Sequence, residues 1–155
     1  MAGSKTTTWI LIADGEHARV VVPAAGRQFR TISSLDSATA HRRSADLGTG
    51  EPGRSYESAS PARHAIEPKS DPHRLAKQSF ARYLADQMNA AAAESRYDHL
   101  VLVAPTSALR DLREALGRKA KARLAGALAR DIVKVADADL EQHLEAFWRL
   151  PGQAA

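Results

Sequence analysis

The sequence predicts an α/β fold, and three observations lead to that class. Two short apolar runs lie near the start of the chain, and an Asp-Gly turn signal follows the first of them. Such runs predict strands. An amphipathic segment of helical length begins near residue 72, and a continuous apolar run follows it at residues 100–104. A chain of 155 residues can bury one core without metals or disulfides. We therefore expect a single domain over residues 1–155, with its core at about 8–36 and 72–149 and a long loop at 37–71.

Three strands are expected to form an antiparallel meander at the N-terminal end. Trp9–Ala13 is the first and Ala18–Val22 is the second, joined by a hairpin turn at Asp14–His17. Residues Arg27–Leu35 predict a third, more exposed strand. Its apolar side chains are Phe29, Ile32 and Leu35.

Alternating helices and strands are predicted after the loop. Asp71 is expected to cap a helix that begins at Pro72 and ends near residue 95. Leu100–Ala104 should be a central strand buried on both faces. A second helix starts at Pro105–Ser107 and ends near Gly117 or runs on through the basic stretch after it.

The last two elements are an edge strand and a helix. Ala125–Asp131 is expected to be the edge strand, and the helix starts near Asp137 with Leu140, Leu144 and Phe147 on one face. The order is then β-β-β-α-β-α-β-α, which predicts a mixed five-stranded sheet, antiparallel in its first part and parallel in its last. This is the ribonuclease-H-like arrangement, also used by a component of the translational machinery, the middle domain of peptide-chain release factors.

The loop carries a Gly-rich motif that we do not expect to bind a nucleotide. Gly48–Ser55 matches GxGxxG, but neither the preceding strand nor the following helix that would bind the phosphate is predicted. The six histidines lack metal-ligand spacing. We therefore expect no cofactor and no metal.

Composition and charge bear on compartment and partners. The chain has no Cys, which suits a reducing compartment, and no apolar stretch of membrane-spanning length, so we expect a cytoplasmic protein without membrane insertion. Residues 110–134 hold eight basic side chains against three acidic ones. Such a segment can meet phosphate groups.

The chain resembles a family of bacterial proteins named for attachment to host cells. The resemblance begins with Trp9–Val20, continues through Asp46–Ser55 and Arg63–Pro72, and returns at Tyr97–Arg113 and Ala129–Ile132. It implies a relationship to the release-factor middle domain, and with it a ribosome or RNA partner. The Gly-Gly-Gln tripeptide of catalytic release factors does not occur in the sequence, so peptidyl-tRNA hydrolysis is not expected.

The leading functional prediction is a non-enzymatic protein that binds the ribosome or structured RNA and affects attachment indirectly. The candidate phosphate contacts are Arg42, Arg43, Arg54, Arg63, Arg118, Lys119, Lys121 and Arg123. One alternative is a divergent metal-dependent nuclease in which Asp14, at the end of the first strand, is the candidate catalytic residue. Another is a regulatory module that binds protein partners. The sequence does not distinguish direct from regulatory action in attachment, and it leaves the oligomeric state open.

Overall fold

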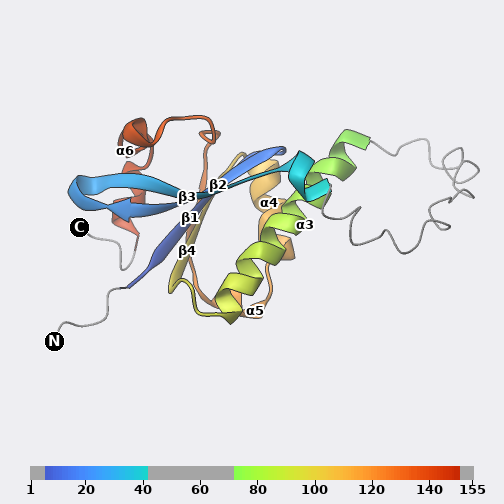
Figure 1. Ribbon diagram of the computed structural model, residues 1–155, viewed down its shortest axis with the longest axis horizontal. Helices are drawn as coiled ribbons and strands as arrows, with labels where there is room; N and C mark the ends of the chain where they lie inside the picture. Colours follow the sequence, from blue (N-terminus) through green and yellow to red (C-terminus); the bar gives the residue numbers. More distant parts are fainter. Residues whose placement is uncertain (1–5, 42–71, 151–155) are drawn as a thin grey trace, which may run out of the picture.

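The computed structural model describes residues 6–41 and 72–150, and it is an α/β protein built on one mixed sheet (Figure 1). The sheet has five strands in the order β3-β2-β1-β4-β5. Their bounds are Thr8–Ala13 for β1, His17–Ala24 for β2, Gln28–Asp36 for β3, His99–Ala104 for β4 and Leu124–Ala129 for β5.

The strands pair in both directions. β1 pairs antiparallel with β2, and β2 antiparallel with β3. β4 lies parallel to β1, and β5 parallel to β4. The predicted mixed five-stranded sheet is confirmed.

Three helices cover one face of this sheet. They are α3 at Pro72–Ala93, α4 at Thr106–Ala115 and α5 at Arg118–Ala122 (Figure 1). The predicted start of the first helix at Pro72 is confirmed, whereas its expected cap, Asp71, lies outside the described residues. The second helix ends before Gly117, and the basic stretch then forms the short helix α5.

The segment after β5 covers the opposite face, and here the prediction of one continuous helix was wrong. It forms two 3-10 turns, η3 at Asp137–Asp139 and η4 at Glu145–Arg149, around the single helical turn α6 at Leu140–His143. Leu144 breaks the helix with φ −114° and ψ 29°. Leu140, Leu144 and Phe147 are nevertheless fully buried on one face, as their spacing predicts.

The buried apolar side chains of the strands divide between two clusters because alternate residues point to opposite faces of a sheet. Leu11 and Ala13 belong to the cluster under the helices, which we call the helix-side cluster. Ile10 and Ile12 belong to the cluster under residues 130–150, which we call the C-terminal segment. All residues from Leu100 to Ala104 have no exposed surface, which confirms the prediction of a central strand buried on both faces. β5 lies at the edge, as predicted, although it ends two residues earlier, at Ala129.

A β-bulge in β3 was not foreseen. Val20 pairs with Ser33 but Val21 pairs with Thr31, so Ile32 is an extra residue without a partner on β2. Because one inserted residue reverses the alternation, Phe29 packs under the C-terminal segment whereas Leu35 packs under the helices. Ile32 itself is 41% exposed.

The predicted loop also begins later than expected. Residues 37–41 are helical, because the Asp36 carboxylate caps this turn by accepting a hydrogen bond of 2.7 Å from the backbone N–H of Thr39. Ala40 on this turn is buried in the helix-side cluster.

Candidate nucleic-acid interface

The predicted phosphate contacts fall into two groups, and the structure describes only one of them. Arg118, Lys119, Lys121 and Arg123 lie on or next to α5. The other four, Arg42, Arg43, Arg54 and Arg63, lie outside the described residues, as does the Gly48–Ser55 motif.

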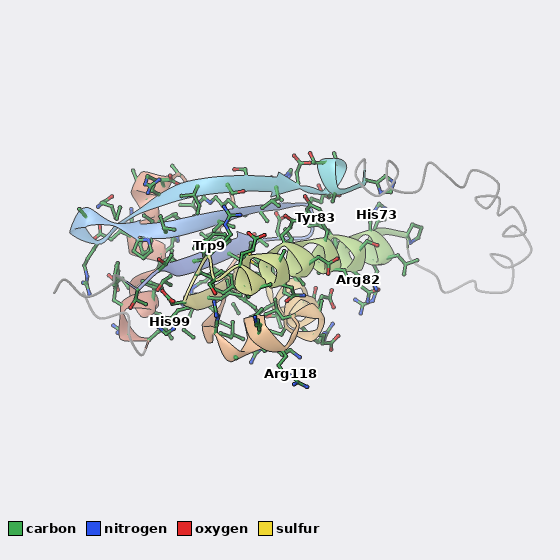
Figure 2. The ribbon with its side chains drawn as sticks, turned by 60° about the horizontal axis from the view of Figure 1, so that its bottom comes forward. Trp9, His73, Arg82, Tyr83, His99 and Arg118 are labelled. Carbon is green, nitrogen blue, oxygen red and sulfur yellow. The ribbon has the colours of Figure 1, made fainter. Side chains whose placement is uncertain are left out.

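α5 presents its cations to solvent because a single alanine holds it on the core. Ala120 has no exposed surface and packs in the helix-side cluster. Arg118, Lys119 and Lys121 are exposed (Figure 2 shows Arg118 pointing away from the ribbon). Within residues 6–41 and 72–150, none of these three side chains forms an ion pair. Their charges are therefore available to a partner.

The start of α5 is fixed by a side chain of α3. The backbone N–H of Gly117 donates a hydrogen bond of 2.8 Å to Oδ1 of Asn89. A Cβ on Gly117 would lie 3.4 Å from that same oxygen, an ordinary van der Waals distance, so the turn lies in contact with the helix. This contact sets where the α5 cations leave the protein surface.

α4, which precedes α5 in the chain, carries two more exposed cations. Leu109 and Leu112 bury one side of α4, while Arg110 and Arg113 are exposed. We call Arg110, Arg113, Arg118, Lys119 and Lys121 the basic surface. Asp111 and Glu114 lie on the same helix, so the excess of positive charge is greatest at α5.

Arg123 differs from the other predicted contacts. It is half-buried, and its guanidinium donates a hydrogen bond of 2.6 Å to the backbone carbonyl of Tyr97. Tyr97 is fully buried, and its hydroxyl donates to the carbonyl of Met88 at 2.9 Å. Burial raises the pKa of Tyr97, and the nearby charge of Arg123 partly opposes this. Arg123 therefore ties β5 to the start of β4.

The alternative catalytic candidate, Asp14, lies in a cleft at the carboxyl ends of the parallel strands, where open α/β sheets commonly bind ligands. The cleft measures about 360 Å³ and places Asp14 and Glu16 near Lys77, Asp131 and Lys134. Oδ1 of Asp14 accepts hydrogen bonds from the backbone N–H groups of Glu16 at 2.8 Å and His17 at 2.7 Å. Asp14 thus shapes the predicted hairpin turn.

A two-metal nuclease needs several carboxylates that converge on its ions. In the part of the chain that the structure describes, no three His, Cys, Asp or Glu side chains are grouped so that they could hold a metal ion. The arrangement around Asp14 gives the nuclease alternative no support. None of the described helices is both long and apolar enough to cross a membrane.

The family model described as "Protein required for attachment to host cells" matches residues 9–144. The chain belongs to this family. The match includes the sheet, apart from Thr8 at the start of β1, and the basic surface.

Other comparisons of this host-attachment family member add little. The comparison with curated proteins found no match. The crystal structure of the archaeal translation termination factor aRF1 is similar with a TM-score of 0.45 and 12% identity, over 92% of this chain and 39% of that one. The chain thus spans less than half of the factor's length, and a likeness at this TM-score supports no conclusion about function.

Sequence reasoning missed one important residue of this host-attachment family member, Arg19 on β2. Its guanidinium lies 3.4 Å from a carboxylate oxygen of Asp137 and also donates to the carbonyl of Val135. Asp137 in turn accepts hydrogen bonds from the hydroxyl of Thr31 at 2.6 Å and from its backbone N–H at 2.9 Å. The signal was visible as one charged residue in the apolar run Ala18–Val22.

Proposed function

We propose that this host-attachment family member binds structured RNA, free or in the ribosome, and contributes to attachment indirectly from the cytoplasm without catalysing a reaction. The basic surface and the loop arginines Arg42, Arg43, Arg54 and Arg63 supply the phosphate contacts. The observation that carries the proposal is the trio Arg118, Lys119 and Lys121, which is exposed and forms no ion pair in the described part of the chain.

Two physical points support a phosphate partner over a purely structural role for these cations. An exposed cation that holds no carboxylate contributes little to folding, because its charge is already solvated. The same cation gains when it displaces condensed counterions from a nucleic acid. Arg113 and the three α5 cations follow one another closely along the chain, so they can meet neighbouring phosphates of one backbone.

We further propose that the sheet has the ribonuclease-H-like arrangement. Support comes from the strand order β3-β2-β1-β4-β5, with antiparallel pairing among the first three strands and parallel pairing of β4 with its two neighbours. This arrangement by itself assigns no chemistry.

Filter binding of the full chain to ribosomes and to a structured RNA over a salt series tests the RNA proposal. We expect the logarithm of the association constant to fall linearly with the logarithm of salt concentration. The triple variant Arg118→Gln, Lys119→Gln, Lys121→Gln should bind more weakly, with the slope reduced by about two to three, because each lost phosphate contact removes about 0.7 to 0.9 of slope.

The matched control removes the same charge elsewhere. Arg30, Arg74 and Arg149 are exposed on β3, α3 and η4, and their combined change to Gln should leave most of the affinity and slope. Equal losses of RNA affinity in the two triple variants would mean that binding depends only on net charge. That result would contradict a defined RNA-binding surface at α5. Retention of a cellular partner after nuclease treatment, without RNA binding, would favour the protein-interaction alternative.

A further inference from the structure

The two edges of the sheet differ in how far their backbone groups are already occupied. The edge at β3 is closed in its middle by the C-terminal segment. The backbone N–H of Thr31 points away from β2 and donates to Asp137, and the bulge at Ile32 interrupts the strand beside it. Bulges and covering segments of this kind protect sheet edges from added strands.

The edge at β5 also has a bulge, because Ala125 lies between the residues that pair with Leu100 and Val101, but from Gly126 to Ala129 the strand is regular. The backbone N–H of Arg130 donates to the carbonyl of Ala104, which places Arg130 on the side of the ladder that faces β4. Because backbone groups alternate in direction along a strand, the N–H groups of Ala127 and Ala129 face outward. In the described part of the chain, β4 is the only strand paired with β5, and no backbone group outside the sheet bonds to Ala127 or Ala129.

Exposed cations lie at both ends of this edge, with one exposed carboxylate, Asp131, next to the cation at the C-terminal end. β5 itself contains no charged residue. The exposed cations of α5 precede it, and the exposed Arg130 follows it. The guanidinium of Arg130 donates to the outward carbonyl of Ala129 at 3.0 Å, so this cation lies along the open edge.

We infer that the outer edge of β5 binds an extended segment of a partner protein, apolar in its middle and acidic at its ends, which adds a further strand to the sheet. Main-chain hydrogen bonds to Ala127 and Ala129 would hold the segment, as in other cases of strand addition. The α5 cations and Arg130 would select acidic flanks by charge complementarity.

A second copy of the chain fits this edge less well. Two β5 strands paired antiparallel about a twofold axis would bring Arg130 of each copy toward the α5 end of the other, so like charges would meet. The inference shares the α5 cations with the proposed RNA contacts, but its main-chain bonds use backbone groups of β5 that RNA binding does not need, so the two proposals can be tested apart.

The test measures binding of a labelled synthetic peptide to the full chain by fluorescence anisotropy. The peptide has alternating Val and Thr in its middle and Glu at both ends, and a second peptide carries Lys in place of Glu. We expect binding of the Glu peptide and at least about tenfold weaker binding of the Lys peptide, which corresponds to about 1.4 kcal/mol. Equal binding of the two peptides would overturn the role of the basic ends.

Two variants of one residue test the edge itself. Ala127→Pro removes the outward N–H while leaving the ladder to β4, and Ala127→Ser keeps this donor. The Pro variant should bind the Glu peptide at least about fivefold more weakly than the Ser variant, through loss of a hydrogen bond and steric exclusion. Unchanged RNA binding by the Pro variant would show that RNA binding does not need the outer edge of β5.

Hydrogen exchange in the unaltered protein covers the case in which the Pro variant fails to fold. The Glu peptide should slow exchange at Ala127 and Ala129 but leave Leu128, which faces β4, unchanged. No added protection at Ala127 and Ala129, or a dimer that forms through this edge without binding the peptide, would overturn the inference.

Discussion

Arg19 is a cation within an apolar strand, and the neighbours that it finds on the C-terminal segment explain its position. Its side chain is 13% exposed, and burial lowers its pKa while the nearby Asp137 carboxylate opposes that change. An arginine remains charged under these conditions, so the cost of burying it must be offset by its bonds to Asp137 and Val135. At the scale of residues, Arg19 fastens the segment after β5 to the sheet.

Replacing Arg19 should therefore destabilise the protein. We expect Arg19→Met to lower the free energy of unfolding by about 1–3 kcal/mol, because the carbonyl of Val135 loses a charged donor and Asp137 loses its ion pair. Urea denaturation measures the change. The matched control is Arg30→Met, which replaces an exposed cation on β3. It should change the free energy of unfolding by less than about 0.5 kcal/mol. Equal effects of the two substitutions would contradict the anchoring role of Arg19.

The carboxylate of Asp137 makes part of this stability dependent on pH. The hydroxyl of Thr31 chiefly lowers the pKa of Asp137 below 3.8, with further lowering from the Thr31 backbone N–H and from Arg19, while burial acts in the opposite direction. A lowered folded-state pKa contributes stability above the unfolded pKa, and this contribution is lost as pH falls through the folded value.

Thr31→Val tests this pH dependence. The variant should be less stable than the unaltered protein at neutral pH, and the difference should shrink as the pH falls below 3.8. Denaturation of both proteins across this range gives the measurement. Thr39→Val, which leaves the Asp137 contacts intact, is the control, and a difference between Thr31→Val and the unaltered protein that stays constant with pH would contradict the assignment.

At the scale of elements, the junction between α5 and β5 separates two kinds of cation that adjoin in sequence. Arg118, Lys119 and Lys121 are exposed, whereas the guanidinium of Arg123 is bonded to the Tyr97 carbonyl. Both kinds contribute the same charge, so composition cannot tell them apart. Their different burial gives Arg123 a role in supporting the sheet and leaves the first three side chains exposed to solvent, where we propose that they bind RNA.

This division predicts opposite results for two neighbouring substitutions. Arg123→Gln should lower the free energy of unfolding by about 1–2 kcal/mol, because the Tyr97 carbonyl loses a charged donor, and should change the RNA salt slope little. Lys121→Gln should leave stability within about 0.5 kcal/mol and reduce the slope. Thermal unfolding and filter binding of both variants provide the comparison, and a large loss of RNA affinity in a stable Arg123→Gln protein would refute it.

At the scale of the whole molecule, the sheet is covered on each face by a different part of the chain. Trp9 packs against the helix-side cluster, and Trp148 packs against the cluster under the C-terminal segment. Trp9 lies 5.2 Å from the ring of Tyr97, and Trp148 lies 5.5 Å from the ring of Phe29. The two tryptophans thus report separately on the two faces.

We expect both faces to unfold together, because β1 and β4 contribute side chains to both clusters. In the Trp9→Phe variant, the denaturation curve monitored by Trp148 fluorescence should coincide with the curve monitored by far-UV circular dichroism. Trp148→Phe, followed by Trp9, should behave in the same way. An earlier transition reported only by Trp148 would show that the C-terminal segment unfolds on its own.

Much of the fold follows from local sequence, whereas little of the candidate site does. The positions of β1, β2, β4 and the start of α3 were predicted because apolar runs, turn residues and Pro72 act through near neighbours. Of the eight predicted phosphate contacts, four lie outside the described residues, three are exposed on α5, and Arg123 is held by Tyr97. The binding role of these eight residues remains a prediction.

Local sequence patterns are enough to predict the α/β class, the order of the strands, the central position of Leu100–Ala104 and the concentration of basic residues around α5. The packed fold was needed to find the bulge at Ile32, the break of the last helix at Leu144 and the cations without an ion pair in the described part of the chain. These features depend on contacts between residues far apart in the chain. Thr31 and Asp137 are 106 residues apart, so their contact, and the bond that holds Arg19 beside them, exist only after the C-terminal segment has packed on the sheet.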